Sequence, residues 1–176
     1  LGQTAEIPGP KKAFLIPNPE VAASMIKKAK RVLLVVGSES TEVKTKDGDL
    51  IDFAIRLSKR KNVTVVATGH LVSEFKKRDA GKVQSMPFVN LGNRLSDPGW
   101  DGFDGKGPYD LAVFAGLPYY LEWLLLSGLK SFAQELKTIS LDNTYQPNAS
   151  WSLGNSAEGA WEEVLDKIAS TLEEGG

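Results

Sequence analysis

Short apolar runs alternate with longer helical segments along most of the chain. The clearest run covers residues 32–36 and ends at Gly37, a pattern typical of a strand buried on both faces of a parallel sheet. Four further runs share this character and predict strands at residues 63–67, 88–91, 111–115 and 138–141.

Helical periodicity separates the predicted strands. Asn18 and Pro19 supply a cap followed by proline at the first helical position, so we expect a short helix to begin there. Apolar side chains recur at helical spacing over residues 50–57 and 161–172, which predicts two more helices. Strands that alternate with helices need right-handed crossovers, so the pattern predicts a doubly wound, three-layer α/β/α fold with a parallel sheet.

The domain organisation follows from length and from proline and glycine. The chain has 176 residues, of which 41% are hydrophobic, and this suffices for one core. Pro8, Gly9 and Pro10 exclude a helix or an interior strand near the start. We therefore expect an extended N-terminal arm over residues 1–17 and a single domain over residues 18–176.

Charge and residue usage exclude several classes of function. A net charge of -1 gives no basic field for nucleic acid or for a membrane surface. The chain has no cysteine, and His70 is its one histidine, so thiolate clusters and clustered imidazole ligands are excluded. We predict no metal site and no catalytic residues, because His70 has no evident carboxylate to orient it.

The longest apolar stretch, residues 117–129, contains Glu122 and is too short to span a bilayer. The first residues do not form a secretory signal, since the apolar run at residues 13–16 is short and is closed by Pro17. The sequence therefore predicts a soluble, cytoplasmic protein.

Two long loops, at residues 97–109 and 143–155, interrupt the alternation. Loops of this length inside a compact domain are usually functional or disordered, and their aromatic residues favour ordered contacts. Trp100 and Phe103 are costly to expose unless a partner or a neighbouring segment covers them. We interpret these two residues as candidates for a protein interface, together with the arm and the loop around Tyr145.

In doubly wound sheets, ligands bind beyond the carboxyl ends of the strands, where the winding direction reverses. Gly37 and Ser38 follow the first strand and offer a possible phosphate seat, but the three-glycine fingerprint is missing and Glu39 and Glu42 would repel an anion. An ordinary turn is the favoured interpretation. The residues that would line a cofactor crevice, if one exists, are Gly37, Ser38, Thr68, Gly69, His70, Gly116, Tyr119 and Tyr120.

Each part of this candidate crevice also has a structural interpretation. The segment Thr68-Gly69-His70 lacks the acid that would bind a ribose, and a lone histidine is more often a capping or packing residue than a proton donor. Tyr119 and Tyr120 could stack on an adenine or flavin ring, although packing is favoured. The helix expected at residues 121–129 is apolar almost all round, so it must be buried in this domain or under another chain.

Several stretches taken together resemble one family across most of the chain. They are KAKRVLLVVG (28–37), ATGH (67–70), DGKGPYDL (104–111), PYY (118–120), LKSF (129–132), KTISLD (137–142) and YQPNA (145–149). In this order they resemble the epsilon subunit of the archaeal acetyl-CoA decarbonylase/synthase (carbon monoxide dehydrogenase) complex, from methanogens and related archaea.

The resemblance implies a Rossmann-like fold of the NAD/FAD-binding type found in deoxyhypusine synthase. It also implies a non-catalytic accessory subunit that pairs with the alpha subunit in an alpha2-epsilon2 carbon monoxide dehydrogenase component and stabilises it, while the nickel and iron–sulfur centres belong to alpha. The alternative is an FAD-binding module that assists electron transfer from alpha. No cofactor residue of the family is carried over to this chain. We also expect homo-oligomeric contacts.

Overall fold

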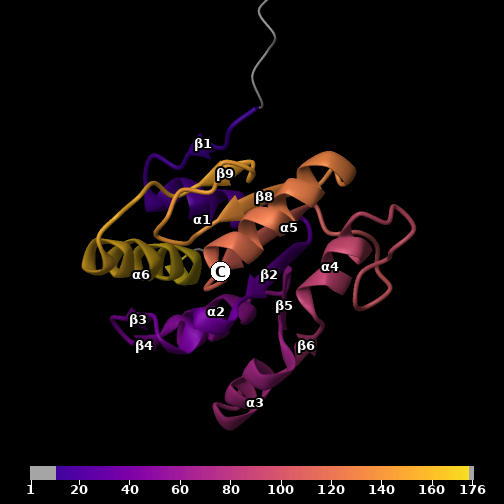
Figure 1. Cartoon of the computed structure of the whole chain (residues 1–176). Helices are drawn as coiled ribbons and strands as arrows, with labels where there is room; N and C mark the ends of the chain where they lie inside the picture. Colours follow the sequence, from indigo (N-terminus) through magenta and orange to yellow (C-terminus); the bar gives the residue numbers. More distant parts are fainter. Residues whose placement is uncertain (1–10, 175–176) are drawn as a thin grey trace, which may run out of the picture.

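The structure of the protein is a computed structural model that describes residues 11–174. Within those residues a central seven-stranded sheet has the order β1-β9-β8-β7-β2-β5-β6, and all neighbouring strands in it run parallel (Figure 1). Its strands are β1 (Phe14–Leu15), β2 (Val32–Val36), β5 (Val63–Ala67), β6 (Val83–Ser85), β7 (Leu111–Ala115), β8 (Lys137–Ser140) and β9 (Trp151–Ser152). A separate hairpin pairs β3 (Lys44–Thr45) with β4 (Gly48–Asp49).

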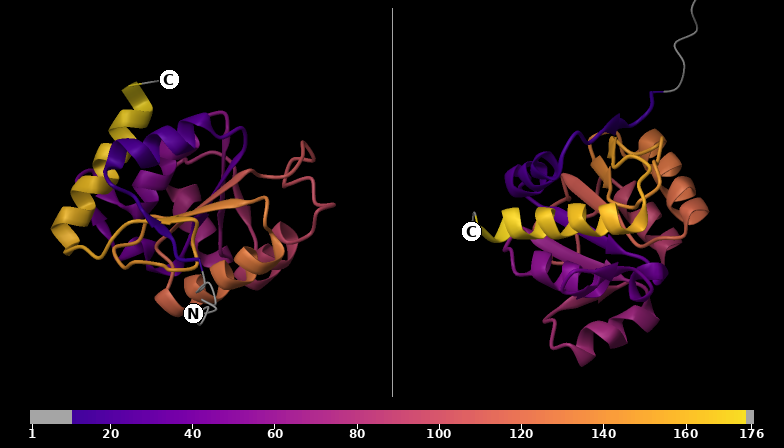
Figure 2. Two further views of the ribbon diagram at one scale, coloured as in Figure 1. Left: turned by 90° about the horizontal axis from the view of Figure 1, so that it is seen from above. Right: turned by 90° about the vertical axis from the view of Figure 1, so that its left-hand side faces the viewer.

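Helices cover both faces of the sheet, which gives three layers (Figure 2). The helices are α1 (Pro19–Lys28), the 3-10 helix η1 (Ser38–Thr41), α2 (Leu50–Ser58), α3 (Gly69–Lys77), α4 (Phe88–Leu95), α5 (Tyr119–Phe132) and α6 (Glu158–Glu174). One apolar cluster joins α1, α2, α3 and α6 to the sheet, and a second cluster joins α4 and α5 to its other face. The arrangement confirms the doubly wound α/β prediction.

Strand β2 lies at the centre of the sheet, and this position explains why its sequence is uniformly apolar. Val32 is paired with Val63 on one side and with Leu111 on the other, and all five residues of β2 are buried. A central parallel strand is covered on both faces, so each position needs an apolar side chain. The chain runs from β2 outward through β5 and β6 and then returns to β7, so the winding reverses between β2 and β7.

One strand prediction is wrong, and one strand lies in a segment that was predicted to be a loop. Residues 88–91 begin helix α4, and the strand in this part of the chain is β6, which is shorter and less buried. Pro87 directly precedes the apolar run and occupies the cap position of α4, while Phe88 and Leu91 lie three positions apart on its buried side. A short apolar run alone does not separate a helix from a strand. The second correction is β9, which lies within the predicted loop at residues 143–155.

The N-terminal arm enters the sheet before it reaches α1. Phe14 and Leu15, which were expected to belong to the arm, form the edge strand β1 beside β9. Residues 1–10 of the predicted arm lie outside the described residues. Among the helices of residues 11–174, none combines the length and the apolar character needed to cross a bilayer.

Candidate functional site

The candidate crevice residues come from the carboxyl ends of three adjacent strands. Val36 is paired with Ala67 of β5 and with Ala115 of β7, so the residues that follow these strands leave the sheet at one edge. The structure therefore places Gly37, Thr68 and Gly116 along the edge where Rossmann-like folds bind cofactors.

Backbone from this chain fills the point where the winding reverses. A Cβ atom added to Gly37 would lie 2.2 Å from the carbonyl oxygen of Gly116, so the two loops meet at backbone distance. Gly116 has a φ of +72°, and a Cβ atom there would lie 2.3 Å from Ser40 Oγ. The two glycines are thus required by contact between the loops, and no side-chain-sized gap separates them.

Two backbone N–H groups in the first loop donate hydrogen bonds within the protein. Gly37 N–H donates to the carbonyl of Ala115 at 2.9 Å, and Glu39 N–H donates to the carbonyl of Gly116 at 2.9 Å. Ser40 Oγ donates to the carbonyl of Gly37 at 2.7 Å, while Ser38 is exposed at the first position of η1. A phosphate bound at such a loop needs free N–H donors. Here the loop uses those of Gly37 and Glu39 to close against β7.

Thr68, Gly69 and His70 begin helix α3, next to this closed point. Gly69 and His70 are exposed, and His70 Nδ1 lies 3.3 Å from Thr68 Oγ1. The partner of the imidazole is thus a hydroxyl from two residues earlier. This contact is local, and it provides no carboxylate of the kind that orients a catalytic histidine.

Tyr119 and Tyr120 open helix α5 at the same edge of the sheet. Their rings pack edge to face with centroids 5.7 Å apart, and Tyr120 is 84% exposed. The Tyr120 side chain therefore lies largely in solvent. The structure brings Gly37 and Gly116 into direct contact and leaves His70 and Tyr120 at the surface.

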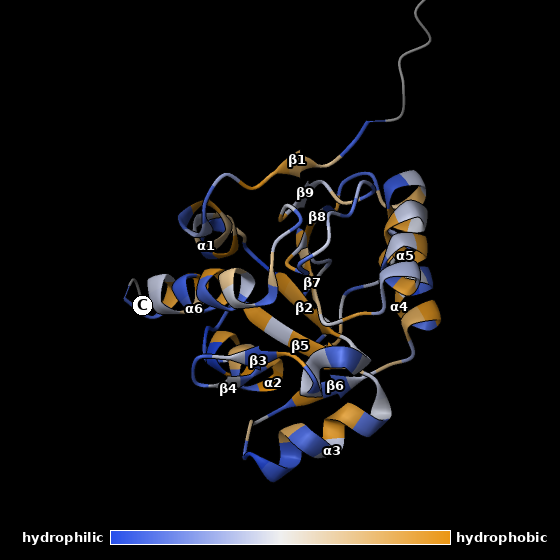
Figure 3. Ribbon diagram, turned by 60° about the vertical axis from the view of Figure 1, so that its left-hand side comes forward, coloured by the Kyte–Doolittle hydropathy of each residue, from blue (hydrophilic) through white to orange (hydrophobic). Residues whose placement is uncertain are grey.

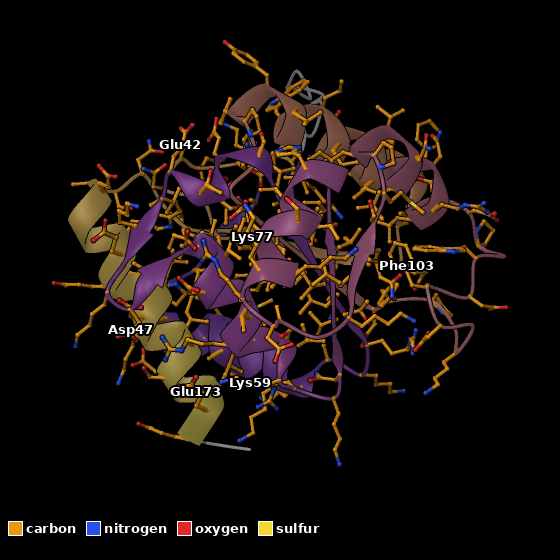
Figure 4. All side chains as sticks on the ribbon, turned by 90° about the horizontal axis from the view of Figure 1, so that it is seen from below. Glu42, Asp47, Lys59, Lys77, Phe103 and Glu173 are labelled. Carbon is orange, nitrogen blue, oxygen red and sulfur yellow. The ribbon has the colours of Figure 1, made fainter. Side chains whose placement is uncertain are left out.

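Trp100 and Phe103, the predicted interface residues, are partly buried against their own domain. The Trp100 ring lies 5.2 Å from the Phe103 ring and 5.8 Å from the Tyr109 ring, measured between centroids. All three belong to the cluster under α4 and α5, and Phe103 lies far from α6 (Figure 4). A neighbouring segment therefore covers these aromatics. Tyr145 is also used internally, because its hydroxyl donates to the carbonyl of Ala13 at 2.6 Å.

A buried pair of carboxyl groups lies beside the closed reversal point. Asp142, just after β8, accepts hydrogen bonds from the backbone N–H of Gly116 at 2.6 Å and of Leu117 at 3.4 Å. Glu122 of α5 is fully buried, and the charge of the nearby Asp142 carboxyl group acts on it. Gln146 Nε2 donates to Glu122 Oε2 at 3.2 Å. The pair thus joins the loop after β7, helix α5 and the loop after β8.

Burial sets the protonation of this pair. Removal from water raises the pKa of Glu122 well above its ordinary value, and the nearby charge of Asp142 raises it further. Burial also raises the pKa of Asp142, whereas the neighbouring Glu122 and the hydrogen bonds from the backbone N–H groups of Gly116 and Leu117 oppose that rise. Asp142 is therefore the ionised member at neutral pH, and Glu122 is the protonated one.

This pair was not predicted from the sequence. There Glu122 is only a charge in an apolar stretch, and Asp142 only the end of the KTISLD stretch. The one sequence signal for the pair is Glu122 itself, an acidic residue inside a predicted helix that is otherwise apolar. A carboxyl group buried in this way needs a polar partner. Both residues are buried, and their hydrogen bonds connect the loop after β7, helix α5 and the loop after β8.

Among residues 11–174, no cluster of three or more histidine, aspartate or glutamate side chains has the geometry of a metal site. At the opposite, amino end of β2, Arg31 donates to Asp104 and lies 5.0 Å from the centre of the Tyr109 ring, which fixes the long loop at residues 97–109 to the sheet.

The parallel sheet, its strand order and the reversal beside β2 define a Rossmann-like α/β protein. A family model described as "CO dehydrogenase beta subunit/acetyl-CoA synthase epsilon subunit" matches residues 2–170, and the chain belongs to this family.

Three curated relatives carry the name of the epsilon subunit of the acetyl-CoA decarbonylase/synthase complex. The Methanothermobacter thermautotrophicus protein is 34% identical over 94% of this chain and 92% of its own length. The Methanothrix soehngenii protein is 37% identical over 88% of this chain and 80% of its own length. Epsilon 1 of Archaeoglobus fulgidus is 36% identical over 86% of this chain and 83% of its own length.

Proposed function

We propose that this chain is a non-catalytic accessory subunit of an acetyl-CoA decarbonylase/synthase complex, which pairs with the alpha subunit in the carbon monoxide dehydrogenase component and stabilises it. The observation that carries the proposal is the packing of Gly37 against Gly116, which fills the place where this fold class binds cofactors. The acidic groups next to it, Glu122 and Asp142, are buried and serve to fasten loops.

The same observation weighs against the alternative of an FAD-binding module for electron transfer. A flavin nucleotide at the reversal point would need an open crevice and free N–H donors for its pyrophosphate. The N–H groups of Gly37 and Glu39 already donate to β7 and to the loop that follows it. Contact with other subunits is therefore the better-supported role.

Carbon monoxide oxidation by alpha, measured with and without this chain, tests the accessory role. At the start of an incubation at fixed temperature, we expect the initial rate of carbon monoxide oxidation per alpha subunit to be the same with and without this chain. Without the chain, the activity should decay several times faster, because a bound partner stabilises the native state by mass action. A chain that contributes to the reaction would instead change the initial rate while leaving the decay unaltered, and that result would contradict the proposal.

A further inference from the structure

Helix α5 keeps one face in the core and leaves the other uncovered. Leu125, Leu126 and Leu129 are buried against the sheet. On the outward side Leu124 is 65% exposed and Phe132 is 76% exposed. The apolar sequence of this helix predicts burial by its own domain or by another chain, and the domain covers only half of it.

A groove runs along this uncovered face between α4 and α5, which lie side by side with apolar segments along both (Figure 3). Its volume is about 290 Å³. Val89, Leu124 and Phe132 stand exposed around it, and Gly92 and Gly128 line it without side chains. The groove is therefore apolar, and its two glycines leave it open.

The two glycines have different explanations. A Cβ atom on Gly92 would lie 2.8 Å from Leu125 Cδ1, so this glycine allows α4 to approach α5. A Cβ atom on Gly128 would have no heavy atom within 4 Å. Glycine inside a helix is less stable than alanine, and no neighbour in the described chain requires it at position 128. The missing side chain at position 128 keeps the groove deep. This depth leaves space for a side chain of a molecule that binds in the groove.

The size and charge of the face indicate what covers it. The exposed apolar side chains that line the groove are Val89, Leu124 and Phe132. Together they present on the order of a few hundred Å² of accessible surface, a size at which an apolar patch on a protein surface marks an interaction site. From Tyr119 to Leu129 the one charged residue of α5 is the buried Glu122. The complementary surface must therefore be apolar and uncharged too.

We propose that the α4–α5 groove is the docking site for an apolar helix of a partner subunit in the complex, an inference that rests on the proposed function. A groove between two helices accepts the side chains of a third helix spaced three and four positions apart. Leu124 and Phe132 form the walls, and the space above Gly128 receives a large apolar side chain of the partner.

Co-purification of the complex with variants of this chain tests the proposal. Leu124→Glu should reduce recovery of the chain with the other subunits at least tenfold, because it places a charge against an apolar helix. Ala160→Glu is the matched control, since Ala160 is exposed on α6, which covers the other face of the sheet, and its variant should be recovered like the wild type. Circular dichroism must show both variants folded.

Gly128→Ala gives an independent test, because it should change the stability of the free chain and its affinity for the complex in opposite directions. The free chain should unfold at a higher temperature, because alanine favours the helix, while its affinity for the complex falls several-fold as the groove fills. Gly159→Ala in α6 is the control, since a Cβ atom there also meets nothing within 4 Å, and affinity should not change.

Three results would overturn the docking site. One is recovery of Leu124→Glu or Gly128→Ala with the complex at wild-type level. In another, the isolated wild-type chain is a dimer, Leu124→Glu makes it a monomer, and the variant still assembles into the complex. This result would assign the groove to a second copy of the chain. The third is a wild-type chain that does not co-purify with other subunits at all, which would refute the proposed function as well.

Discussion

Gly116 combines two demands at a single residue, a left-handed backbone conformation and close contact with a neighbouring loop. Its φ of +72° disfavours any residue with a side chain, and Ser40 occupies the space where a Cβ atom would lie. The left-handed backbone costs about 1–2 kcal/mol for alanine, and overpacking adds about 1–3 kcal/mol.

Gly116→Ala should therefore lower the free energy of unfolding by about 3 kcal/mol, measured by denaturant titration. Gly105→Ala is the control, since Gly105 has a φ of +68° and a Cβ atom there would meet nothing within 4 Å. It should lose only about 1–2 kcal/mol. Equal losses in the two variants would show that the loops at the reversal point do not pack as described.

Glu122 predicts a specific dependence of stability on pH. Its folded pKa lies above the ordinary value of 4.5, so the folded state holds a proton that the unfolded state releases at neutral pH. The stabilising contribution of Glu122 is thus complete below that ordinary value and is lost as pH rises toward the raised folded pKa. The glutamine in Glu122→Gln cannot ionise, so the variant does not lose this stabilisation as the pH rises.

The free energy of unfolding of Glu122→Gln, relative to wild type, should therefore rise by about 2 kcal/mol or more between about pH 5 and about pH 9. Denaturant titrations at several pH values across this range measure it. Glu135→Gln replaces an exposed carboxylate and should follow the wild-type profile. Parallel profiles for Glu122→Gln and wild type would refute the buried protonated pair.

At the scale of elements, the start of α2 is fastened to the end of α3 through Asp49. Its side chain caps α2 by accepting from the N–H of Ile51 at 2.9 Å and of Asp52 at 3.2 Å. It also pairs with both terminal nitrogens of Arg78, at 2.6 and 2.8 Å. Burial opposes ionisation of Asp49, but the hydrogen bonds and charge of Arg78, together with the hydrogen bonds from the backbone N–H groups of Asp52 and Ile51, outweigh it and lower the pKa of the carboxyl group.

Asp49→Asn and Asp49→Ala separate these two roles. Asparagine keeps a capping oxygen and loses the charge, so it should cost about 1–2 kcal/mol. Alanine loses the cap as well and leaves Arg78 with Asp52 as its remaining partner, so it should cost about 1 kcal/mol more. Thermal unfolding of both variants measures the difference, and identical losses would contradict a capping role.

The same scale shows what the sequence could and could not predict. The buried strands β2, β5 and β7 were predictable, because a continuous apolar run of five residues between turn signals fits few other structures. Residues 88–91 were not, since four apolar-rich residues after Pro87 fit a strand or a helix equally well. Strand β9 has two residues and lies in an irregular loop, where periodicity carries no signal.

The sequence predicted where the candidate residues lie, but not whether the loops leave the edge of the sheet open there. Parallel strands place the residues after β2, β5 and β7 at one edge, and Gly37, Thr68 and Gly116 lie at that edge in the structure. Whether the edge is open depends on how two loops pack, and no local pattern encodes this. The Glu122–Asp142 pair depends on a contact between residues far apart in the sequence and on different elements, which one sequence does not reveal.

At the scale of the whole molecule, the two faces of the sheet differ in what lies over them. Helices α1, α2 and α6 form a continuous cover, whose outer surface includes ion pairs such as Arg56 with Glu173 near the end of α6. The α4–α5 face is apolar and uncovered. A fold whose usual cofactor crevice is filled and whose second face is apolar is suited to work through contacts.

Titration of the purified chain with FAD, followed by flavin fluorescence and calorimetry, tests the central claim that the packed loops at the reversal point hold no cofactor. The same titration with the chain assembled on its partner subunit shows whether the partner completes a site. We expect no saturable binding in either sample at concentrations that saturate flavoproteins. Saturable one-to-one binding to the chain, weakened by substitutions at Thr68 or Tyr119, would show instead that the reversal point is open to a cofactor.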